Sequence, residues 1–228
     1  MRAMILSAGR GERMRPFTDH TPKPLLTVQG KPLIVYHLEA FAKMGILEVV
    51  INLGHLGDKI KAFLGTGSQF GIHIEYSPED PILETGGGIA NALPLLGSDP
   101  FLVVSADVLT DFPFNKLPSH PEGLMHLVLT NNPDYHPKGD FAIEAGKILD
   151  PSDPNTQDKK LNFGGIAIYR PELFHDCPQG IFPLSHLFKK AIALKAATGE
   201  HYTGQWFNIG TNDQLISAET LYRNPIVF

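Results

Sequence analysis

The first half of the chain alternates short apolar runs with stretches of helical periodicity. Runs of four to six apolar or β-branched residues are typical of buried strands, whereas apolar residues that recur every three or four positions indicate helices. Strands that alternate with helices predict an α/β fold with a doubly wound, mainly parallel, Rossmann-like mixed sheet. We predict strands at 3–7, 48–52, 72–76 and 101–105, and helices at 33–44, 58–64 and 86–96.

The second half has shorter apolar runs, separated by Pro, Gly, Asn and Asp. No repeat, linker or low-complexity tract interrupts them, and the length suits one domain over residues 1–228. Either Thr211 or Asn212 is the expected N-cap of the last helix. Here we predict strands at 127–130, 141–144, 147–149 and 166–169, and helices at 183–197 and 214–222.

Composition narrows the class of protein. Hydrophobic residues make up 43% of the chain and charged residues 19%, as in an ordinary globular protein. A net charge of −5 argues against nucleic acid as a partner, because such binding needs a basic face. The single cysteine, Cys177, cannot form an internal disulfide. With no secretory signal or membrane span in the sequence, we expect a cytoplasmic protein with no membrane partner.

The loop after the first predicted strand, SAGRGERMRP followed by HTPKPL, has the strongest chemical signal. Gly9 and Gly11 allow backbone N–H groups to approach an anion closely. The spacing is not that of a Walker loop, and Met14 occupies the third glycine position of the dinucleotide fingerprint. The loop is therefore either another kind of phosphate site or a glycine turn with solvated arginines. Positive charge in or beside it comes from Arg10, Arg13, Arg15 and Lys23.

The loops that follow three predicted strands should meet in space. Ligands of open α/β sheets bind beyond the carboxyl ends of the strands. The segments 7–15 and 78–88 and the residue Asp107 all follow such strands. We therefore expect them to line one crevice.

Five motifs in order resemble those of the sugar-nucleotide pyrophosphorylases, which are sugar 1-phosphate nucleotidyltransferases. The motifs are LSAGRGERMRPFT with TPKPLL, then YSPEDPILETGGGI, VVSADVLTD, GDFAI and WFNIGT. The resemblance implies a GT-A-like fold with a nucleotide-binding half at 1–115 and a sugar-binding half at 116–228. It also implies Mg²⁺ as cofactor, a nucleoside triphosphate and a sugar 1-phosphate as small-molecule substrates, and a monomer or weak homodimer.

The resemblance also assigns roles to residues. The catalytic residues would be Arg13, Lys23 and Asp107. Those that bind the nucleotide would be Ala8, Gly9, Gly11, Glu12, Arg13, Lys23, Glu79, Thr85 and Gly86. Those that bind the sugar would be Gly87, Gly139, Asp140, Asn162 and Gly164, and the metal ligands would be Asp107 and Asn208.

Within the family, the strings GERMRP, LETGGGI and GEHYTGQW resemble the short bacterial uridylyltransferases of peptidoglycan recycling, whose acceptor is a muramyl sugar 1-phosphate. That acceptor carries a lactyl carboxylate, and the N–H groups of residues 86–88, at a predicted helix start, could receive it. A simple glycine turn is an equal alternative at that place. One departure is Asn208, which stands where the family often has Asp.

Other functions stay open at this point. The acceptor could be glucose 1-phosphate or mannose 1-phosphate, with thymidylyl, uridylyl or guanylyl transfer, or it could be phosphocholine with a cytidylyl donor. A non-catalytic regulatory homologue would be expected to lack Arg13, Lys23 or Asp107, and all three are present. A nucleic-acid-binding module that uses the arginine-rich loop is disfavoured by the acidic net charge.

Overall fold

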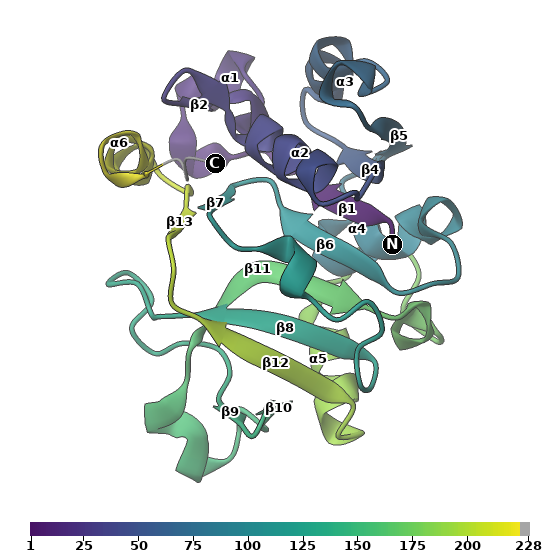
Figure 1. Ribbon diagram of the computed structural model, residues 1–228, viewed down its shortest axis with the longest axis vertical. Helices are drawn as coiled ribbons and strands as arrows, with labels where there is room; N and C mark the ends of the chain where they lie inside the picture. Colours follow the sequence, from purple (N-terminus) through teal and green to yellow (C-terminus); the bar gives the residue numbers. More distant parts are fainter. Residues whose placement is uncertain (224–228) are drawn as a thin grey trace.

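A nine-stranded sheet runs through the whole molecule in the computed structural model, which describes residues 1–223 (Figure 1). The last five residues of the expected domain, 224–228, lie outside the described part. The strand order is β5-β4-β1-β6-β11-β8-β12-β10-β9. The strands are β1 (Ala3–Leu6), β4 (Glu48–Leu53), β5 (His73–Pro78), β6 (Phe101–Ser105), β8 (Met125–Thr130), β9 (Ile143–Glu144), β10 (Lys147–Ile148), β11 (Asn162–Tyr169) and β12 (Ala197–Tyr202).

The sheet is mixed but mainly parallel, which confirms the predicted fold class. Strands β5, β4, β1 and β6 are parallel neighbours, and β12 is parallel to β8. Between these two groups, β11 runs antiparallel to both β6 and β8. Because the strands of the first group are parallel, their carboxyl ends lie at one edge of the sheet. The loops that we predicted to meet follow these ends.

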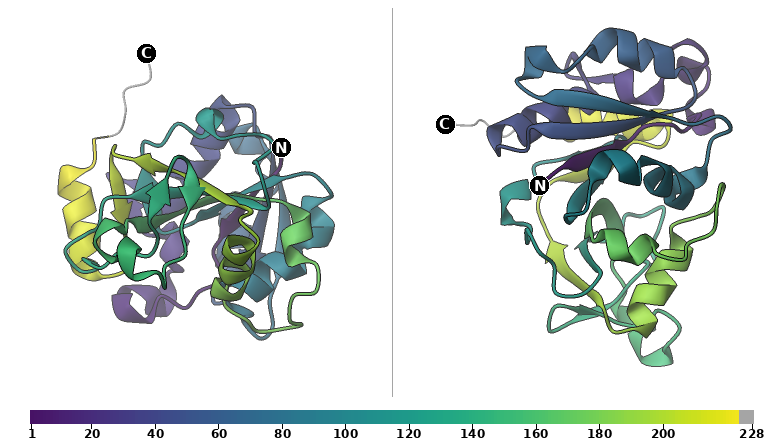
Figure 2. Two further views of the ribbon diagram at one scale, coloured as in Figure 1. Left: turned by 90° about the horizontal axis from the view of Figure 1, so that it is seen from below. Right: turned by 90° about the vertical axis from the view of Figure 1, so that its right-hand side faces the viewer.

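Helices cover both faces of the sheet (Figure 2). Side chains alternate along each strand, so Ile5 faces the core under α2 and α3 whereas Met4 faces the core under α4 and α5. A smaller core contains Val28, Leu109, Ile209 and, from the last helix, Ala218. The helices are α1 (Phe17–His20), α2 (Leu33–Lys43), α3 (Gly57–Leu64), α4 (Glu84–Leu96), α5 (Ser185–Ala193) and α6 (Asn212–Leu221).

The predicted helix at 183–197 is wrong at its carboxyl end. Helix α5 stops at Ala193, and Ala197 already belongs to β12, which pairs in parallel with β8 over six residues. Leu194, Lys195 and Ala196 separate the two elements, and the high helix propensity of alanine favoured a helix that continued through them. The long-range pairing with β8 decides the outcome, and the sequence pattern contains no information about that partner.

Several short elements were also missed, because their strands are only two or three residues long. They include β2 (Thr27–Val28), β3 (Lys31–Pro32), β7 (Val108–Thr110) and β13 (Trp206–Asn208). The pairing of β7 with β13 brings Asp107, which immediately precedes β7, close to Asn208 in β13. At the last helix, Thr211 rather than Asn212 is the N-cap: its side chain accepts a hydrogen bond from the Gln214 N–H at 3.3 Å.

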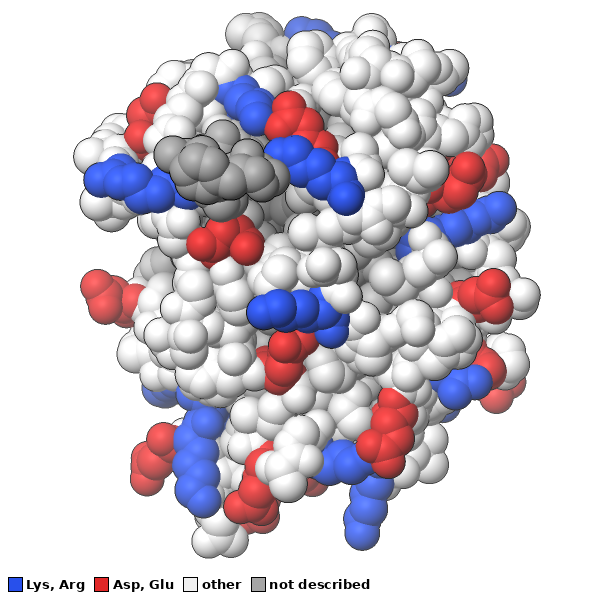
Figure 3. Space-filling view, viewed as in Figure 1, with Lys and Arg blue, Asp and Glu red and all other residues white. Residues whose placement is uncertain are grey.

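No helix within residues 1–223 has both the length and the apolar character needed to cross a bilayer. On the face shown in Figure 3, Lys and Arg side chains are interspersed with Asp and Glu. That face therefore lacks the continuous basic surface that a nucleic-acid partner needs.

Candidate active site

A cavity of about 790 Å³ lies beyond the carboxyl ends of β1 and β6; we call it the large cavity. Its wall combines the loop after β1, the segment before α4 and the turn after β6. The predicted convergence of three loops on one crevice is thus confirmed. Its lining includes Gly9, Arg10, Gly11, Glu12, Arg13, Lys23, Ile82, Glu84, Thr85, Ser105, Ala106, Asp107 and Gly210.

The glycine-rich loop is held in one conformation. Gly11 has φ +64°, and a Cβ there would lie 3.0 Å from the Thr18 Cγ2 atom. Its carbonyl accepts hydrogen bonds from the Met14 N–H at 2.9 Å and from the Thr18 hydroxyl at 2.9 Å. Because the Met14 side chain is fully buried, the following 3₁₀ turn, η1 (Glu12–Met14), is anchored in the core. This anchoring leaves Glu12 and Arg13 in the cavity wall.

Two of the three arginines in this loop line the large cavity, and the third does not. Arg10 and Arg13 line the large cavity, and the Arg13 guanidinium packs close to Gly210. Arg15 instead forms an ion pair with Asp19 at 3.3 Å and does not line the cavity. The loop therefore offers two guanidinium groups to an anion in the cavity.

Lys23 and Asp107 form an ion pair at the floor of the large cavity. Lys23 begins the 3₁₀ turn η2 (Lys23–Leu25), and Asp107 occupies the turn between β6 and β7. They are separated by 84 residues in the chain, and both side chains are largely buried. A cation and a carboxylate fixed together beside two arginines make a site suited to phosphate groups and a metal ion.

Asp107 lies where two cavities meet. A second cavity of about 330 Å³, the small cavity, shares Leu6, Thr85, Ser105 and Asp107 with the large one. Apart from Asp107, it is mostly apolar and aromatic, and no Lys or Arg of the described chain lines it. Its wall also contains Phe163, Gly165, Tyr169, Leu184, Phe188, Trp206 and Asn208.

The pairing of β7 with β13 brings Asn208 beside Asp107. Asn208 is the register partner of Val108, and the Ile209 N–H donates to the Asp107 carbonyl at 2.8 Å. Both side chains line the small cavity. A carboxylate and an amide oxygen are hard ligands of the kind that Mg²⁺ prefers, so these residues fit the metal implied by the sequence.

A different cluster in the described chain has histidine and carboxylate ligand atoms within 4.8 Å of one another. It consists of Glu48, His73 and Glu75. These residues lie toward the amino ends of β4 and β5, at the opposite end of the sheet from Asp107. This cluster is therefore not the predicted metal site.

Glu79, the expected contact to the base, is buried and does not line the large cavity. Its carboxylate accepts hydrogen bonds from the Asn52 amide at 2.7 Å and from the Leu83 N–H at 2.9 Å. These two hydrogen bonds link β4 to the start of α4. Glu84, which belongs to the segment 78–88 expected in the crevice, lines the cavity instead, with an unusual φ of +59°.

The glycines at the start of α4 allow neighbouring segments to pack closely against this helix. A Cβ on Gly86 would lie 2.5 Å from the Phe182 ring, and one on Gly87 would meet the Gly180 carbonyl. The Gly87 N–H already donates to the Phe182 carbonyl at 3.1 Å. The Gly87 N–H is therefore already engaged, and neither Gly86 nor Gly87 lines the large or the small cavity. Of this segment, Thr85 lines both cavities.

Ala8 also lies behind the wall rather than in it. It is buried, and its carbonyl accepts a hydrogen bond from the His55 N–H at 3.1 Å. Its neighbour Gly9 lines the large cavity.

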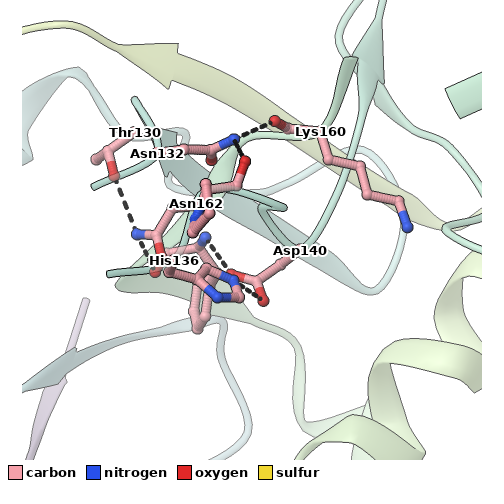
Figure 4. Close-up of polar contacts among 8 residues, drawn as sticks. Thr130, Asn132, His136, Asp140, Lys160 and Asn162 are labelled. Carbon is pink, nitrogen blue, oxygen red and sulfur yellow. Dashed lines mark hydrogen bonds and ion pairs between the residues drawn. The ribbon is translucent and has the colours of Figure 1, made fainter. Parts of the chain in front are cut away.

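The predicted sugar-binding residues form a network beside the small cavity (Figure 4). Asp140 pairs with the His136 ring at 3.0 Å and accepts a hydrogen bond from the Phe163 N–H at 2.8 Å. The Asn162 amide donates to the Thr130 hydroxyl at 3.1 Å. Two residues of β11, Phe163 and Gly165, line the small cavity. The cavity lining does not include the predicted residues Gly139, Asp140, Asn162 and Gly164.

His37 is buried and packs against the rings of Phe41 and Phe114, which also contact each other. Burial lowers the pKa of His37 from 6.5 to about 4, although the Asp107 charge and nearby backbone carbonyls oppose the shift. The ring is therefore neutral in the folded protein at neutral pH.

Acidification should destabilise the protein through His37. Between pH 7 and pH 5 the imidazole gains a proton in the unfolded chain but not in the folded one, so the free energy of unfolding falls by about 2 kcal/mol. Urea unfolding at both pH values, for the wild type and for His37→Phe, measures this contribution. An equal pH dependence in both proteins would contradict it.

Comparison with known proteins identifies the family to which the chain belongs. Residues 2–127 match the family model described as nucleotidyl transferase. The chain is 46% identical to an N-acetylmuramate α-1-phosphate uridylyltransferase from Neisseria meningitidis serogroup B, over 97% of this chain and 98% of the relative. It is 32% identical to the enzyme of that name from Caulobacter vibrioides, over 95% of each.

Two more distant proteins are similar to almost the whole chain, one in sequence and one in structure. A mannose-1-phosphate guanylyltransferase catalytic subunit β from Dictyostelium discoideum is 31% identical over 99% of this chain, but the match spans 66% of that protein. The structure of a putative glucose-1-phosphate thymidylyltransferase from Bacillus anthracis superposes with a TM-score of 0.87 at 23% identity, over 100% of this chain and 97% of that one. The chain belongs to the nucleotidyl transferase family of sugar-phosphate nucleotidyltransferases.

Proposed function

We propose that the protein condenses UTP with N-acetylmuramic acid α-1-phosphate to give UDP-N-acetylmuramic acid and pyrophosphate. The observation that carries this proposal is the 46% identity with the Neisseria uridylyltransferase over almost the full length of both chains. The guanylyltransferase match is weaker and covers only part of a longer protein. In this role the protein acts in the cytoplasm in peptidoglycan recycling, uses Mg²⁺, and works as a monomer or weak homodimer.

The two cavities supply places for the two substrates. The triphosphate of UTP lies in the large cavity, where Arg10, Arg13 and Lys23 provide cations. The sugar of the acceptor lies in the small cavity against its apolar wall, and its phosphate reaches Asp107, which both cavities share. On this basis residues 1–115 bind the nucleotide, and residues 116–228 supply much of the sugar side.

The reaction follows from charge and position. A phosphate monoester has a second pKa near about 6, so the acceptor oxygen is already ionised at neutral pH and needs no general base. It attacks the α-phosphorus of UTP, the bond to the β-phosphate oxygen breaks, and pyrophosphate leaves with the electron pair. Arg13 pairs with the departing pyrophosphate, and Lys23 pairs with oxygens of the reacting phosphates. Asp107 and Asn208 would hold Mg²⁺, which would supply positive charge beside the phosphate oxygens.

A pyrophosphate-release assay tests the proposed function. UTP, CTP, GTP, ATP and dTTP are each combined with N-acetylmuramic acid, N-acetylglucosamine, glucose and mannose 1-phosphates and with phosphocholine. We expect the highest rate with UTP and the muramyl acceptor. A highest rate with GTP and mannose 1-phosphate, or with dTTP and glucose 1-phosphate, would replace the proposed substrates.

The acceptor preference should be measurable. We expect kcat/KM for N-acetylmuramic acid 1-phosphate to exceed that for N-acetylglucosamine 1-phosphate by at least ~10-fold, the discrimination that a pocket shaped for one additional group typically provides. Phe188→Ala, which removes part of the apolar wall of the small cavity, should reduce the ratio. Equal kcat/KM values for the two sugars would exclude the muramyl assignment and leave nucleotidyl transfer intact.

A further inference from the structure

Asn52, near the end of β4, is 4% exposed and does not itself line the large cavity. Its side-chain oxygen accepts a hydrogen bond from the Ser7 N–H at 2.7 Å, and its NH₂ group donates to the Glu79 carboxylate at 2.7 Å. The Ser7 hydroxyl also donates to the Asn52 carbonyl. One buried amide therefore joins the residue that follows β1 to the residue that follows β5.

Both partners of Asn52 control parts of the wall of the large cavity. Ser7 lines the cavity directly. Glu79 does so indirectly, because its second carboxylate oxygen accepts a hydrogen bond from the Leu83 N–H at 2.9 Å and so fixes the segment 79–83. Ile82, within this segment, lines the cavity. Asn52 thus holds Ser7 and the segment 79–83 at a fixed separation.

Gly88 provides the space for this contact. A Cβ at position 88 would lie 2.4 Å from the Glu79 carboxylate and 3.1 Å from the Asn52 amide nitrogen. Gly88 does not have a left-handed φ, so the backbone conformation does not require glycine there. The close approach of α4 to the Asn52–Glu79 pair is what requires it.

The hydrogen bonds give the Asn52 amide one favourable orientation. The Ser7 N–H is a donor and needs the amide oxygen, whereas the Glu79 carboxylate only accepts and needs the NH₂ group. The reversed orientation would place two donors together and two acceptors together in a buried position, and unpaired buried groups are costly. The link between the two wall segments therefore has a defined polarity, which substitutions can reverse.

Charge divides the lining of the large cavity into two parts. Its cations come from the glycine-rich loop and from Lys23, and in the proposed function they pair with the triphosphate. The uncharged nucleoside then lies against the part of the lining without cations, which includes Ser7, Ile82 and Thr85. The two wall segments that Asn52 joins both belong to this second part.

We propose that Asn52 is a positioning residue for the donor nucleotide, because it sets the separation of the two wall segments that hold the nucleoside. The phosphate end of the cavity does not depend on it in the same way, since Gly11 and the buried Met14 anchor the glycine-rich loop. The inference rests on one part of the proposed function, that UTP binds in the large cavity. It does not rest on the identity of the acceptor.

Calorimetric titration with UTP and with tripolyphosphate, both in the presence of Mg²⁺, tests the proposal without turnover. Asn52→Asp keeps the shape of the side chain and the acceptor for the Ser7 N–H, but it places a second carboxylate against Glu79. We expect the Kd for UTP to rise at least ~10-fold, because repulsion reduces the population of the binding-competent wall to about a tenth or less. Tripolyphosphate has no nucleoside, so its Kd should change by less than ~2-fold, as expected for an independent site.

A second substitution reverses the polarity of the pair and should restore binding. In Asn52→Asp/Glu79→Gln the new amide donates to the new carboxylate, and its oxygen still accepts from the Leu83 N–H. The net charge equals that of the wild type. Glu79→Gln alone places two donors together and should weaken UTP binding, whereas the double variant should bind UTP within ~3-fold of the wild type.

A control separates this role from general damage. Asn91→Asp makes the same chemical change at an exposed residue of α4 whose amide donates to the Ser77 hydroxyl at 3.0 Å, and it should leave both Kd values unchanged. Circular dichroism checks that each variant folds. If Asn52→Asp does not fold, Glu79→Gln, which adds no charge, provides the same comparison of UTP with tripolyphosphate.

Three results would overturn the role of Asn52. They are wild-type affinity for UTP in the single variants, an equal loss of UTP and tripolyphosphate binding, and no recovery in the folded double variant. Failure of the proposed donor appears differently, in the wild type itself. Wild-type protein that binds tripolyphosphate but not UTP would overturn both the donor and the role of Asn52 in holding it.

Discussion

Asp107→Ala is expected to lower kcat for nucleotidyl transfer by at least ~1,000-fold, the largest effect of any single substitution at this site. Loss of one preorganised charge at a reaction centre typically costs about 100- to 1,000-fold, and here the substitution removes the carboxylate ligand of the metal as well. Asn208 alone is a neutral ligand and cannot replace that charge. The substitution also leaves Lys23 without its ion-pair partner, so the cation is no longer held in place.

Steady-state kinetics over a range of Mg²⁺ concentrations measures this effect. Asp99→Ala is a matched control, because Asp99 is an exposed aspartate in the connection between α4 and β6, away from both cavities. The control should keep full activity. If the Asp107 variant kept its activity, and a chelator did not abolish it, the metal site would have to lie elsewhere.

Lys23→Ala is expected to lower kcat by at least ~100-fold while the protein stays folded. The Lys23 ammonium group lines the large cavity, where it is ion-paired with Asp107 and largely shielded from solvent. A fixed donor at such a position is worth roughly this factor, because it stabilises the charge that develops during transfer. The fold should survive, because the side chain contributes one ion pair at the cavity floor and little to the hydrophobic core.

The matched control is Lys43→Ala, at an exposed lysine in the last turn of α2. We expect wild-type kcat for that variant and native circular-dichroism spectra for both. Normal turnover of Lys23→Ala with a native spectrum would remove Lys23 from the mechanism.

The parallel half of the fold was predictable because its signals are local. Strands such as 101–105 are short apolar runs, and the helix at 33–44 has a clear apolar stripe, so each element can be read without its neighbours. Strand β12 was not predictable, because its sequence, ATGEHY, has no clear alternation of apolar and polar residues and becomes a strand only through its pairing with β8. The short pair β7–β13 depends in the same way on two segments about 100 residues apart.

The convergence of the site was predictable for a topological reason. Parallel strands place their carboxyl ends at one edge, so loops after three strands had to meet there. The hydrogen-bond partners of individual side chains could not be predicted from the motifs. Glu79 and Asp140 are carboxylates in motif positions, but their partners, Asn52 and the Phe163 N–H, come from other strands and occupy them. Only the folded chain shows that these carboxylates hold the walls of the site.

The arrangement of two cavities around one aspartate explains why the fold suits a two-substrate displacement. The large cavity has cations for a polyphosphate, and the small one has apolar and aromatic walls for a sugar ring. Asp107 lines both cavities, and in the proposed function the two phosphates approach each other there. Rate enhancement in such a site comes from positioning and charge neutralisation rather than from a protein nucleophile.

Isotope transfer from a labelled acceptor tests this account most directly. N-acetylmuramic acid 1-phosphate that carries ¹⁸O in its phosphate is incubated with UTP, Mg²⁺ and the wild-type protein, and the products are analysed by mass spectrometry. Direct attack of the sugar phosphate on the α-phosphorus predicts UDP-N-acetylmuramic acid that retains all of the label, together with unlabelled pyrophosphate. Labelled pyrophosphate, or the absence of UDP-N-acetylmuramic acid, would contradict the account.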